Sequence, residues 1–160
     1  YKDASGPALQ AYLDDVLASP WQPQYRLVRD EQTVIADTLV DLADQCACDL
    51  ILISGGTGPS PRDVTPEAMA NVCDRMLQGF GEEMRRASLR DVPTAILSRQ
   101  EAGLRGHCLI IALPGKPSAI RTCLDAVFPA IPYCLDLIGA ARLETRAERL
   151  TAFRPSAQSQ

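Results

Sequence analysis

Two uninterrupted apolar runs, each followed at once by a glycine-containing loop, restrict the possible folds of this chain more than any other feature. They are Leu50–Ser54 and Cys108–Leu113, and each has the length of a β-strand. A strand without polar alternation is typical of a parallel sheet that helices cover on both faces. Stretches with apolar residues at helical spacing alternate with the two runs. The sequence therefore predicts an α/β fold with a mostly parallel sheet flanked by helices.

Helices and one further short strand are expected around these runs. Helical spacing covers residues 8–17, 34–43, 65–77, 118–127 and 132–138, and another helix is expected from Gly81 to near Pro93. Residues 24–28 (QYRLV) have the composition of a strand. A length of 160 residues suits one domain, which we place at residues 1–145. Residues 146–160 form a polar C-terminal tail, and the last dozen residues are expected to fray.

Charge and hydropathy argue against two classes of protein. The formal net charge of -4 is unlike that of a protein whose main role is to bind nucleic acid. No apolar stretch approaches the roughly 20 residues that a membrane-spanning helix needs, and no secretory signal is visible in this sequence. We therefore expect neither a nucleic-acid partner nor a membrane.

The cysteines are expected to be free thiols. With the single histidine His107, they lack the ligand types and the spacing of a zinc site. A free cysteine packs well as a small apolar residue, and a reducing, cytoplasmic compartment keeps it reduced. The six are Cys46, Cys48, Cys73, Cys108, Cys123 and Cys134.

The loops that follow the two apolar runs are the natural walls of a ligand site, because ligands of open α/β sheets bind at the carboxyl ends of strands. Gly55, Gly56 and Gly58 allow a sharp turn whose N–H groups can approach an anion. The common phosphate-binding motifs are absent: Pro117 follows Lys116 where a Walker loop needs Ser or Thr, and the dinucleotide spacing also fails. The first loop either binds an anion through an uncommon pattern or is only a tight turn.

Two aspartates near the strand ends suggest a metal. Asp63 follows the glycine loop and Asp30 follows residues 24–28. Mg²⁺ binds through one or two carboxylates together with phosphate oxygens of a substrate, which would explain a carboxylate beside a phosphate-type loop. The alternative is that both are helix caps or solvated loop acids. Arg62 and Arg99 could likewise contact phosphate or simply lie on the surface.

Four stretches together resemble one family. Residues 54–68 (SGGTGPSPRDVTPEA) look like the signature of molybdopterin adenylyltransferases of the MogA type. Residues 29–32 (RDEQ), 93–99 (PTAILSR) and 113–117 (LPGKP) agree in order and spacing. The resemblance extends from Tyr1 to about Leu143, and residues 128–133 (FPAIPY) are also similar to the related gephyrin G domain.

The resemblance implies a three-layer molybdopterin-binding fold, usually assembled as a homotrimer. It implies transfer of AMP from Mg-ATP to the terminal phosphate of molybdopterin, with release of pyrophosphate. A separate molybdenum insertase would use the product. The family's two required aspartates align with Asp30 and Asp63, which are therefore expected to be catalytic and to hold Mg²⁺.

The resemblance also implies a set of substrate-binding residues in the two loops and in the stretch before residue 100. These are Gly55, Gly56, Thr57, Gly58, Ser98, Arg99, Pro114, Gly115, Lys116 and Pro117.

One departure from the family pattern concerns the start of the chain. The family begins with a further strand that ends in Ser-x-Ser-Asp-Arg, and nothing in this sequence corresponds to it. We expect either that residues upstream of Tyr1 supply it or that the chain is truncated, with sheet edges exposed.

Three further functions remain open at this point. The first is that of a related pterin-fold enzyme, such as the insertase or the nucleotide-cleaving domain of competence-damage proteins. Those families carry different residues after the double glycine, so Thr57 and residues 62–67 favour the adenylyltransferase. The second is that of a non-catalytic molybdopterin carrier or storage protein, and the third is that of a scaffold protein.

Overall fold

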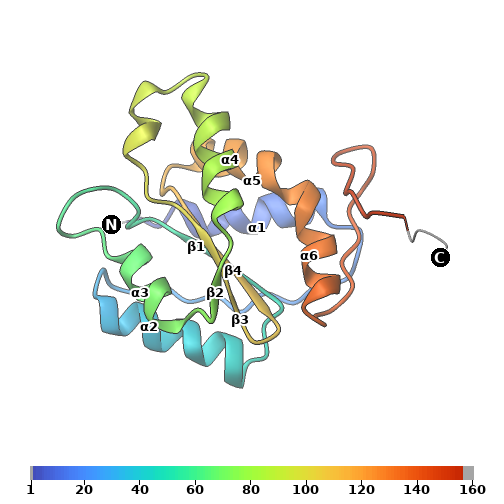
Figure 1. Cartoon of the computed structure of the whole chain (residues 1–160), viewed down its shortest axis with the longest axis horizontal. Helices are drawn as coiled ribbons and strands as arrows, with labels where there is room; N and C mark the ends of the chain where they lie inside the picture. The colour runs from blue at the N-terminus through green and yellow to red at the C-terminus, as the bar shows by residue number, and fades with distance from the viewer. Residues whose placement is uncertain (1, 157–160) are drawn as a thin grey trace.

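The computed structural model describes residues 2–156 and shows three layers, with helices on both faces of a four-stranded sheet (Figure 1). The strands are β1 (Leu50–Ser54), β2 (Arg75–Met76), β3 (Ala102–Arg105) and β4 (Cys108–Leu113). The helices are α1 (Ser5–Val16), α2 (Gln32–Val40), α3 (Thr65–Val72), α4 (Gln78–Leu89), α5 (Pro117–Val127) and α6 (Ile131–Leu137). The remaining elements are a short π-helix, η1 (Asp41–Gln45), and two 3-10 helices, η2 (Pro93–Leu97) and η3 (Phe128–Ala130).

The sheet is mixed, so the prediction of a mostly parallel sheet is wrong. The strand order is β1-β4-β3-β2, and only β1 and β4 pair in parallel. The other two pairings are antiparallel. A tight turn with Gly106 in the left-handed region (φ 54°) sends the chain from β3 straight back into β4. Two residues leave no room for the crossover that a parallel pair needs.

The central strand β4 divides the core into two parts, which explains why its sequence is apolar throughout. Leu109, Ile111 and Leu113 pack with α1, α4, α5 and α6 on one face. Cys108, Ile110 and Ala112 pack with α2 and α3 on the other. All six residues of β4 are buried, as the unbroken apolar run predicts.

Residues 24–28 do not form the predicted strand. They run without regular structure along the outer side of β1, and Tyr25, Arg26 and Leu27 are exposed. Alternating composition alone cannot make a strand, because a strand needs a partner for its backbone groups. Within the described residues, β1 keeps a free outer edge.

The expected helix over residues 65–77 ends at Val72. The chain turns extended at Cys73, and Arg75 and Met76 pair with β3 instead. Both β2 and β3 are too short and too mixed in polarity to be recognised in the sequence.

The C-terminal segment packs against the body of the protein, so the prediction of fraying is wrong for residues 149–156. Leu150 is buried in the core cluster with α1 and α5. The Arg146 amide donates to the Val16 carbonyl at 2.8 Å, and the Phe153 amide donates to the Pro129 carbonyl at 3.0 Å. Residues 157–160 lie outside the described residues.

All six cysteines are free, as expected, although only Cys108 and Cys123 are fully buried. Burial raises the pKa of the Cys108 thiol to about 12. Among the helices of residues 2–156, none has the length and apolar character that a membrane crossing requires.

Candidate active site

The loops after β1 and β4 lie against each other, because their parent strands are parallel neighbours. The Gly55 amide donates to the Leu113 carbonyl at 2.9 Å, and a Cβ at Gly115 would lie 3.6 Å from the Cα of Gly55. The hydroxyl of Ser5, in the first turn of α1, donates to the Gly115 carbonyl at 2.6 Å. A cavity of about 400 Å³ opens between the loops. Its lining consists of Gly55, Gly56, Thr57, Gly58, Pro59, Asp63, Thr94, Leu97, Ser98, Pro114 and Gly115.

The glycine loop, residues 55–63, starts with two left-handed residues, Gly55 (φ 91°) and Gly56 (φ 67°). The Thr65 hydroxyl donates to the Gly55 carbonyl at 2.9 Å, and the Thr65 amide donates to the Gly56 carbonyl at 3.1 Å. A Cβ on Gly56 would lie 2.5 Å from the Thr65 Oγ1, so a side chain does not fit there. Glycine is therefore required at this position by both conformation and space.

Three amides of this loop are available to an anionic ligand. Within residues 2–156, the N–H groups of Gly56, Thr57 and Gly58 donate to no protein acceptor. Successive free N–H groups in a turn form a concave site for anions. This arrangement supports the anion-binding interpretation of the loop.

Asp63 closes the same loop and is half-buried. Its Oδ2 accepts a hydrogen bond from the Ser60 amide at 3.0 Å and lies 2.7 Å from the position of a Cβ on Gly58. Asp63 does not cap α3, which begins at Thr65 without a side-chain cap. The carboxylate instead lines the 400 Å³ cavity.

Asp30 lies in a different cavity, which also borders the glycine loop. This second cavity has a volume of about 1480 Å³ and extends along the free edge of β1, between α1, α2 and residues 20–30. Asp30 is exposed, and among the described residues its carboxylate has no hydrogen-bond or ion-pair partner. It does not cap α2 either. The two cavities share Gly55 and Gly56, so the two predicted aspartates lie in neighbouring cavities that meet at the glycine loop.

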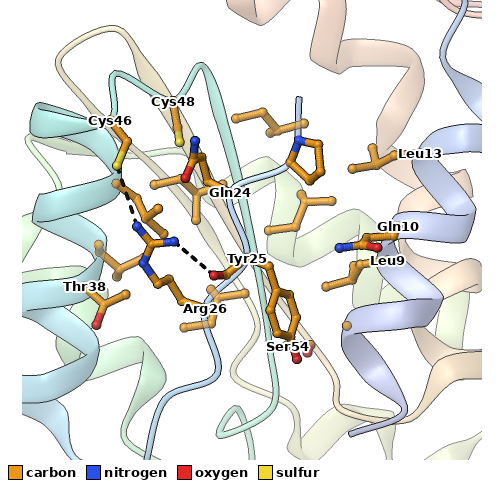
Figure 2. Close-up of a pocket in the computed structure, with 18 of the residues that line it drawn as sticks. Leu9, Gln10, Leu13, Gln24, Tyr25, Arg26, Thr38, Cys46, Cys48 and Ser54 are labelled. Carbon is orange, nitrogen blue, oxygen red and sulfur yellow. Dashed lines mark hydrogen bonds between the residues drawn. The ribbon is translucent and has the colours of Figure 1, made fainter. Parts of the chain in front are cut away.

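Figure 2 shows the walls of the larger cavity. Leu9 and Leu13 come from α1, and Thr38 comes from α2. Tyr25 points toward Ser54 at the end of β1, and Arg26 extends toward α2. The Arg26 guanidinium donates a hydrogen bond to the carbonyl of the preceding residue, Tyr25, at 3.0 Å. The apolar part of this cavity therefore lies along β1, and its polar end reaches the glycine loop.

The predicted substrate-binding residues fall into two groups. Seven line the 400 Å³ cavity, whereas Arg99, Lys116 and Pro117 do not. Lys116 is exposed and immediately precedes α5, which begins at Pro117. The Arg99 guanidinium is occupied by the glycine loop and by Glu67, and Arg99 holds the pKa of the Glu67 carboxyl below its ordinary value by hydrogen bonding.

The residues present fit a magnesium ion only if a substrate supplies further ligands. In the part of the chain that the structure describes, no three acidic, histidine or cysteine side chains gather into a metal site. Asp63 keeps Oδ1 free of protein hydrogen bonds within residues 2–156. A carboxylate oxygen is a ligand that Mg²⁺ prefers, and the ion usually completes its shell with waters and substrate phosphates.

Several residues of the site could not be found from the sequence. Thr94 and Leu97 reach the cavity from η2, and Ser5 reaches the second loop from α1. Thr65 and Glu67 read as the start of a helix, and only the folded chain brings them to the glycine loop and Arg99. Long-range contacts of this kind leave no signal in local spacing.

The chain is similar to a family of known domains, to curated proteins and to solved structures. Residues 1–133 match the model of the "Probable molybdopterin binding domain" family. A molybdopterin adenylyltransferase of Helicobacter pylori (strain J99) is 53% identical over 97% of this chain and 88% of its own length. That of Escherichia coli (strain K12) is 44% identical over 97% of this chain and 86% of its own length. The crystal structure of the molybdopterin biosynthesis enzyme MoaB from Thermus thermophilus has a TM-score of 0.79 and 42% identity, covering 89% of both chains.

Proposed function

Since the chain belongs to the family of the probable molybdopterin binding domain, we propose that its glycine-loop cavity carries out the adenylyl transfer for which its curated relatives are named. The activity is that of a molybdopterin adenylyltransferase in molybdenum cofactor biosynthesis. The site residues, the use of Mg-ATP and the assembly state are likewise our own proposals.

The reaction is a displacement at phosphorus. An oxygen of the terminal phosphate of molybdopterin attacks the α-phosphorus of ATP and forms a new P–O bond. The bond between the α-phosphorus and the bridging oxygen breaks, and pyrophosphate leaves with the electron pair. The products are adenylylated molybdopterin and pyrophosphate.

The protein contributes position and charge rather than covalent chemistry. We assign the free N–H groups of Gly56, Thr57 and Gly58 to hydrogen bonds with the phosphate oxygens. Lys116, in the second loop, would supply a positive charge to the same phosphates. The loop is fixed before substrate binds, so its donors need no reorganisation during the reaction. Ser98 and Pro114 line the same cavity, and we assign them to the walls around the pterin.

Asp63 would hold Mg²⁺ jointly with substrate phosphates, and Asp30, which lines the neighbouring cavity, would reach the ion through water. The bound ion would supply charge neutralisation as pyrophosphate leaves. Asp63 itself is oriented by the Ser60 amide, which keeps its carboxylate toward the cavity.

The observation that carries this proposal is the pairing of free loop amides with the Asp63 carboxylate in one cavity, on a chain that is 53% identical to a molybdopterin adenylyltransferase. A plain tight turn needs neither free donors nor an acid at its end. A non-catalytic carrier would need the amides but not the acid.

The test is a direct assay of the purified chain with molybdopterin, ATP and Mg²⁺, following pyrophosphate release and adenylylated pterin. We expect product from the wild-type protein and a loss of about 100-fold or more in kcat for Asp63→Asn, with pterin affinity largely kept, because the acid acts mainly on the transition state. Asp14→Asn is the matched control, since Asp14 lies on the exposed face of α1. Tight pterin binding without product in any variant would instead identify a carrier.

We also propose the homotrimer and the downstream molybdenum insertase that the family resemblance implies. Exposed apolar side chains such as Ile96 and Leu97 on η2 provide surface for a contact between subunits. Sedimentation equilibrium of the purified chain tests the assembly: a single species of one chain's mass would contradict the trimer.

A further inference from the structure

Arg99 ties Thr57 and Gly58 of the glycine loop to its end at Asp63. Its Nε donates to the Gly58 carbonyl at 2.9 Å, and its Nη2 donates to the Asp63 carbonyl at 2.7 Å. Its own amide donates to the Thr57 carbonyl at 2.7 Å. One residue therefore bonds three carbonyl groups of the loop, on both sides of the turn that presents the free amides and the acid.

Glu67 completes this arrangement from α3. Its carboxylate accepts hydrogen bonds from Nη1 and Nη2 of Arg99, the second at 3.4 Å. Glu67 sits in the first turn of α3, between the buried residues Pro66 and Ala68, so its backbone is fixed by the core. Both side chains of the pair are partly exposed to solvent. We therefore expect the ion pair to contribute little to the free energy of unfolding.

The segment that carries Arg99 is fixed from behind. Arg85 of α4 donates to the Gln100 carbonyl at 2.8 Å, and the Ala112 amide of β4 donates to the Glu101 carbonyl at 2.8 Å. Gln100 is only 1% exposed. The backbone next to Arg99 is thus bonded to β4 and α4, and the Arg99 side chain extends from there to the glycine loop.

We propose that Arg99, held by Glu67, is a positioning residue for the adenylyl transfer: it sets the spacing between the free loop amides and the Asp63 carboxylate without contacting substrate. This inference rests on the proposed function and goes beyond it, because it assigns Glu67 a role and moves Arg99 from ligand to support. Without Arg99, the start of the loop would be held by the bonds of Gly55 to Leu113 and to Thr65, and its end by the short Ser60–Asp63 turn.

The geometry requires a guanidinium. Arg99 donates in three directions at once, to two carbonyls and to one carboxylate, from a planar fork. A lysine ammonium could keep the charge but could not reach all three acceptors in this arrangement. Exchanging the charges in the double variant Glu67→Arg/Arg99→Glu would keep an ion pair and lose both side-chain contacts to carbonyls.

The experiment measures steady-state kinetics of adenylyl transfer for Arg99→Ala, Arg99→Lys, Glu67→Gln and the charge exchange. We expect kcat to fall by about 10- to 100-fold in the two Arg99 variants and in the exchange, with KM for both substrates within about threefold of wild type, because a misplaced catalytic group costs rate rather than binding. Glu67→Gln should lose less, since its amide oxygen still accepts from Arg99. Methylguanidinium added to Arg99→Ala should restore part of kcat.

Arg86→Ala is the matched control, because Arg86 forms an exposed ion pair with Glu83 on α4. It should leave kcat and KM unchanged. A rise in KM with unchanged kcat in Arg99→Lys would make Arg99 a direct substrate ligand and overturn the inference. Wild-type kcat in Arg99→Ala, or full activity of the charge exchange, would overturn it as well.

Failure of the proposed function gives a different pattern. A wild-type protein that binds molybdopterin and makes no product removes adenylyl transfer, whatever the variants do. Hydrogen exchange still tests the positioning role in that case: Arg99→Lys should speed exchange of the Asp63 and Thr65 amides, which are bonded to carbonyls within the loop, while Arg86→Ala should not. Unchanged exchange in Arg99→Lys would overturn the role.

Discussion

The two cavities that meet at Gly55 and Gly56 have walls of different construction. The 400 Å³ cavity is bounded by loops that are tied to β4, to α3 and to Arg99 through backbone carbonyls. The 1480 Å³ cavity is bounded on its outer side by residues 20–30, and none of the amides of residues 21–30 donates a backbone hydrogen bond within the described part of the chain. Exposed side-chain contacts hold that wall, such as Tyr25 with Asp3 and Arg26 with Asp41.

This difference follows the chemistry expected of each region. A group that stabilises developing charge must be in place before the reaction, and multiple bonds to rigid elements achieve this. A wall that only encloses a ligand can be held by fewer contacts and can adjust to its shape. The smaller cavity therefore has the construction of a reaction centre, and the larger one has that of an enclosing wall.

The largest effect should come from Gly56→Ala, which attacks the better-fixed region. The left-handed backbone costs an alanine about 1–2 kcal/mol, and the clash with Thr65 Oγ1 adds about 1–3 kcal/mol. We expect unfolding by urea to report a loss of about 2–5 kcal/mol and the assay to report loss of adenylyl transfer. Gly79→Ala is the control, because nothing lies within 4 Å of that Cβ; it should be neutral or more stable by up to about 1 kcal/mol. Equal effects of the two changes would contradict the prediction.

Hydrogen exchange of the wild-type protein should separate the two walls directly. The amides of Gly55, Thr65 and Arg99 are bonded to carbonyls of β4 or of the loop, so they should exchange at least about 100-fold more slowly than those of Gln22 and Leu27. Residue-resolved exchange followed by NMR gives this ratio for single amides. Comparable protection of the two sets of amides would remove the contrast between the cavities.

A smaller effect is expected from pH. Arg99 lowers the pKa of Glu67 in the folded protein, so the contribution of this pair is fully present above the unfolded value near 4.5 and is lost as pH falls through the lower folded value. The stability difference between wild type and Glu67→Gln should therefore be constant at neutral pH and shrink as the solution is acidified below pH 4.5. Urea titrations at several pH values measure it. A difference that grows on acidification would contradict the assigned sign.

The last prediction concerns the reactivity of the cysteine thiols, which shows how far solvent reaches into each region and needs no substitution. Cys46 and Cys48 line the larger cavity, whereas Cys108 and Cys123 lie in the core. Burial raises the pKa of Cys108 to about 12, so its thiolate is scarce at neutral pH. We expect an aromatic disulfide reagent to label Cys46 first and to reach Cys108 and Cys123 only on unfolding. Early labelling of Cys108 would show that the core opens more readily than the packing indicates.

The sequence was sufficient to predict the parts of the fold that are encoded locally. The bounds of β1 and β4 are correct because an unbroken apolar run is the direct signature of a strand buried on both faces. The loop glycines and Asp63 line one cavity because strand ends in a parallel pair meet at one edge.

What failed was decided by partners far along the chain. Residues 24–28 have strand composition, yet no neighbouring strand pairs with them in the described part of the chain. The antiparallel half of the sheet depends on β3, whose four residues include Gly103 and Arg105 and carry almost no strand signal. The contact of Arg99 with Glu67 joins positions 32 residues apart, and no local pattern predicts it.

The bonding of the C-terminal segment to α1 has a consequence for synthesis on the ribosome. The Arg146 side chain donates to the Leu17 carbonyl, and these residues are 129 positions apart. At roughly 5–20 residues per second, α1 leaves the ribosome many seconds before the segment that seals its end. During that interval Val16 and Leu17, both buried in the finished protein, stay open to chaperones.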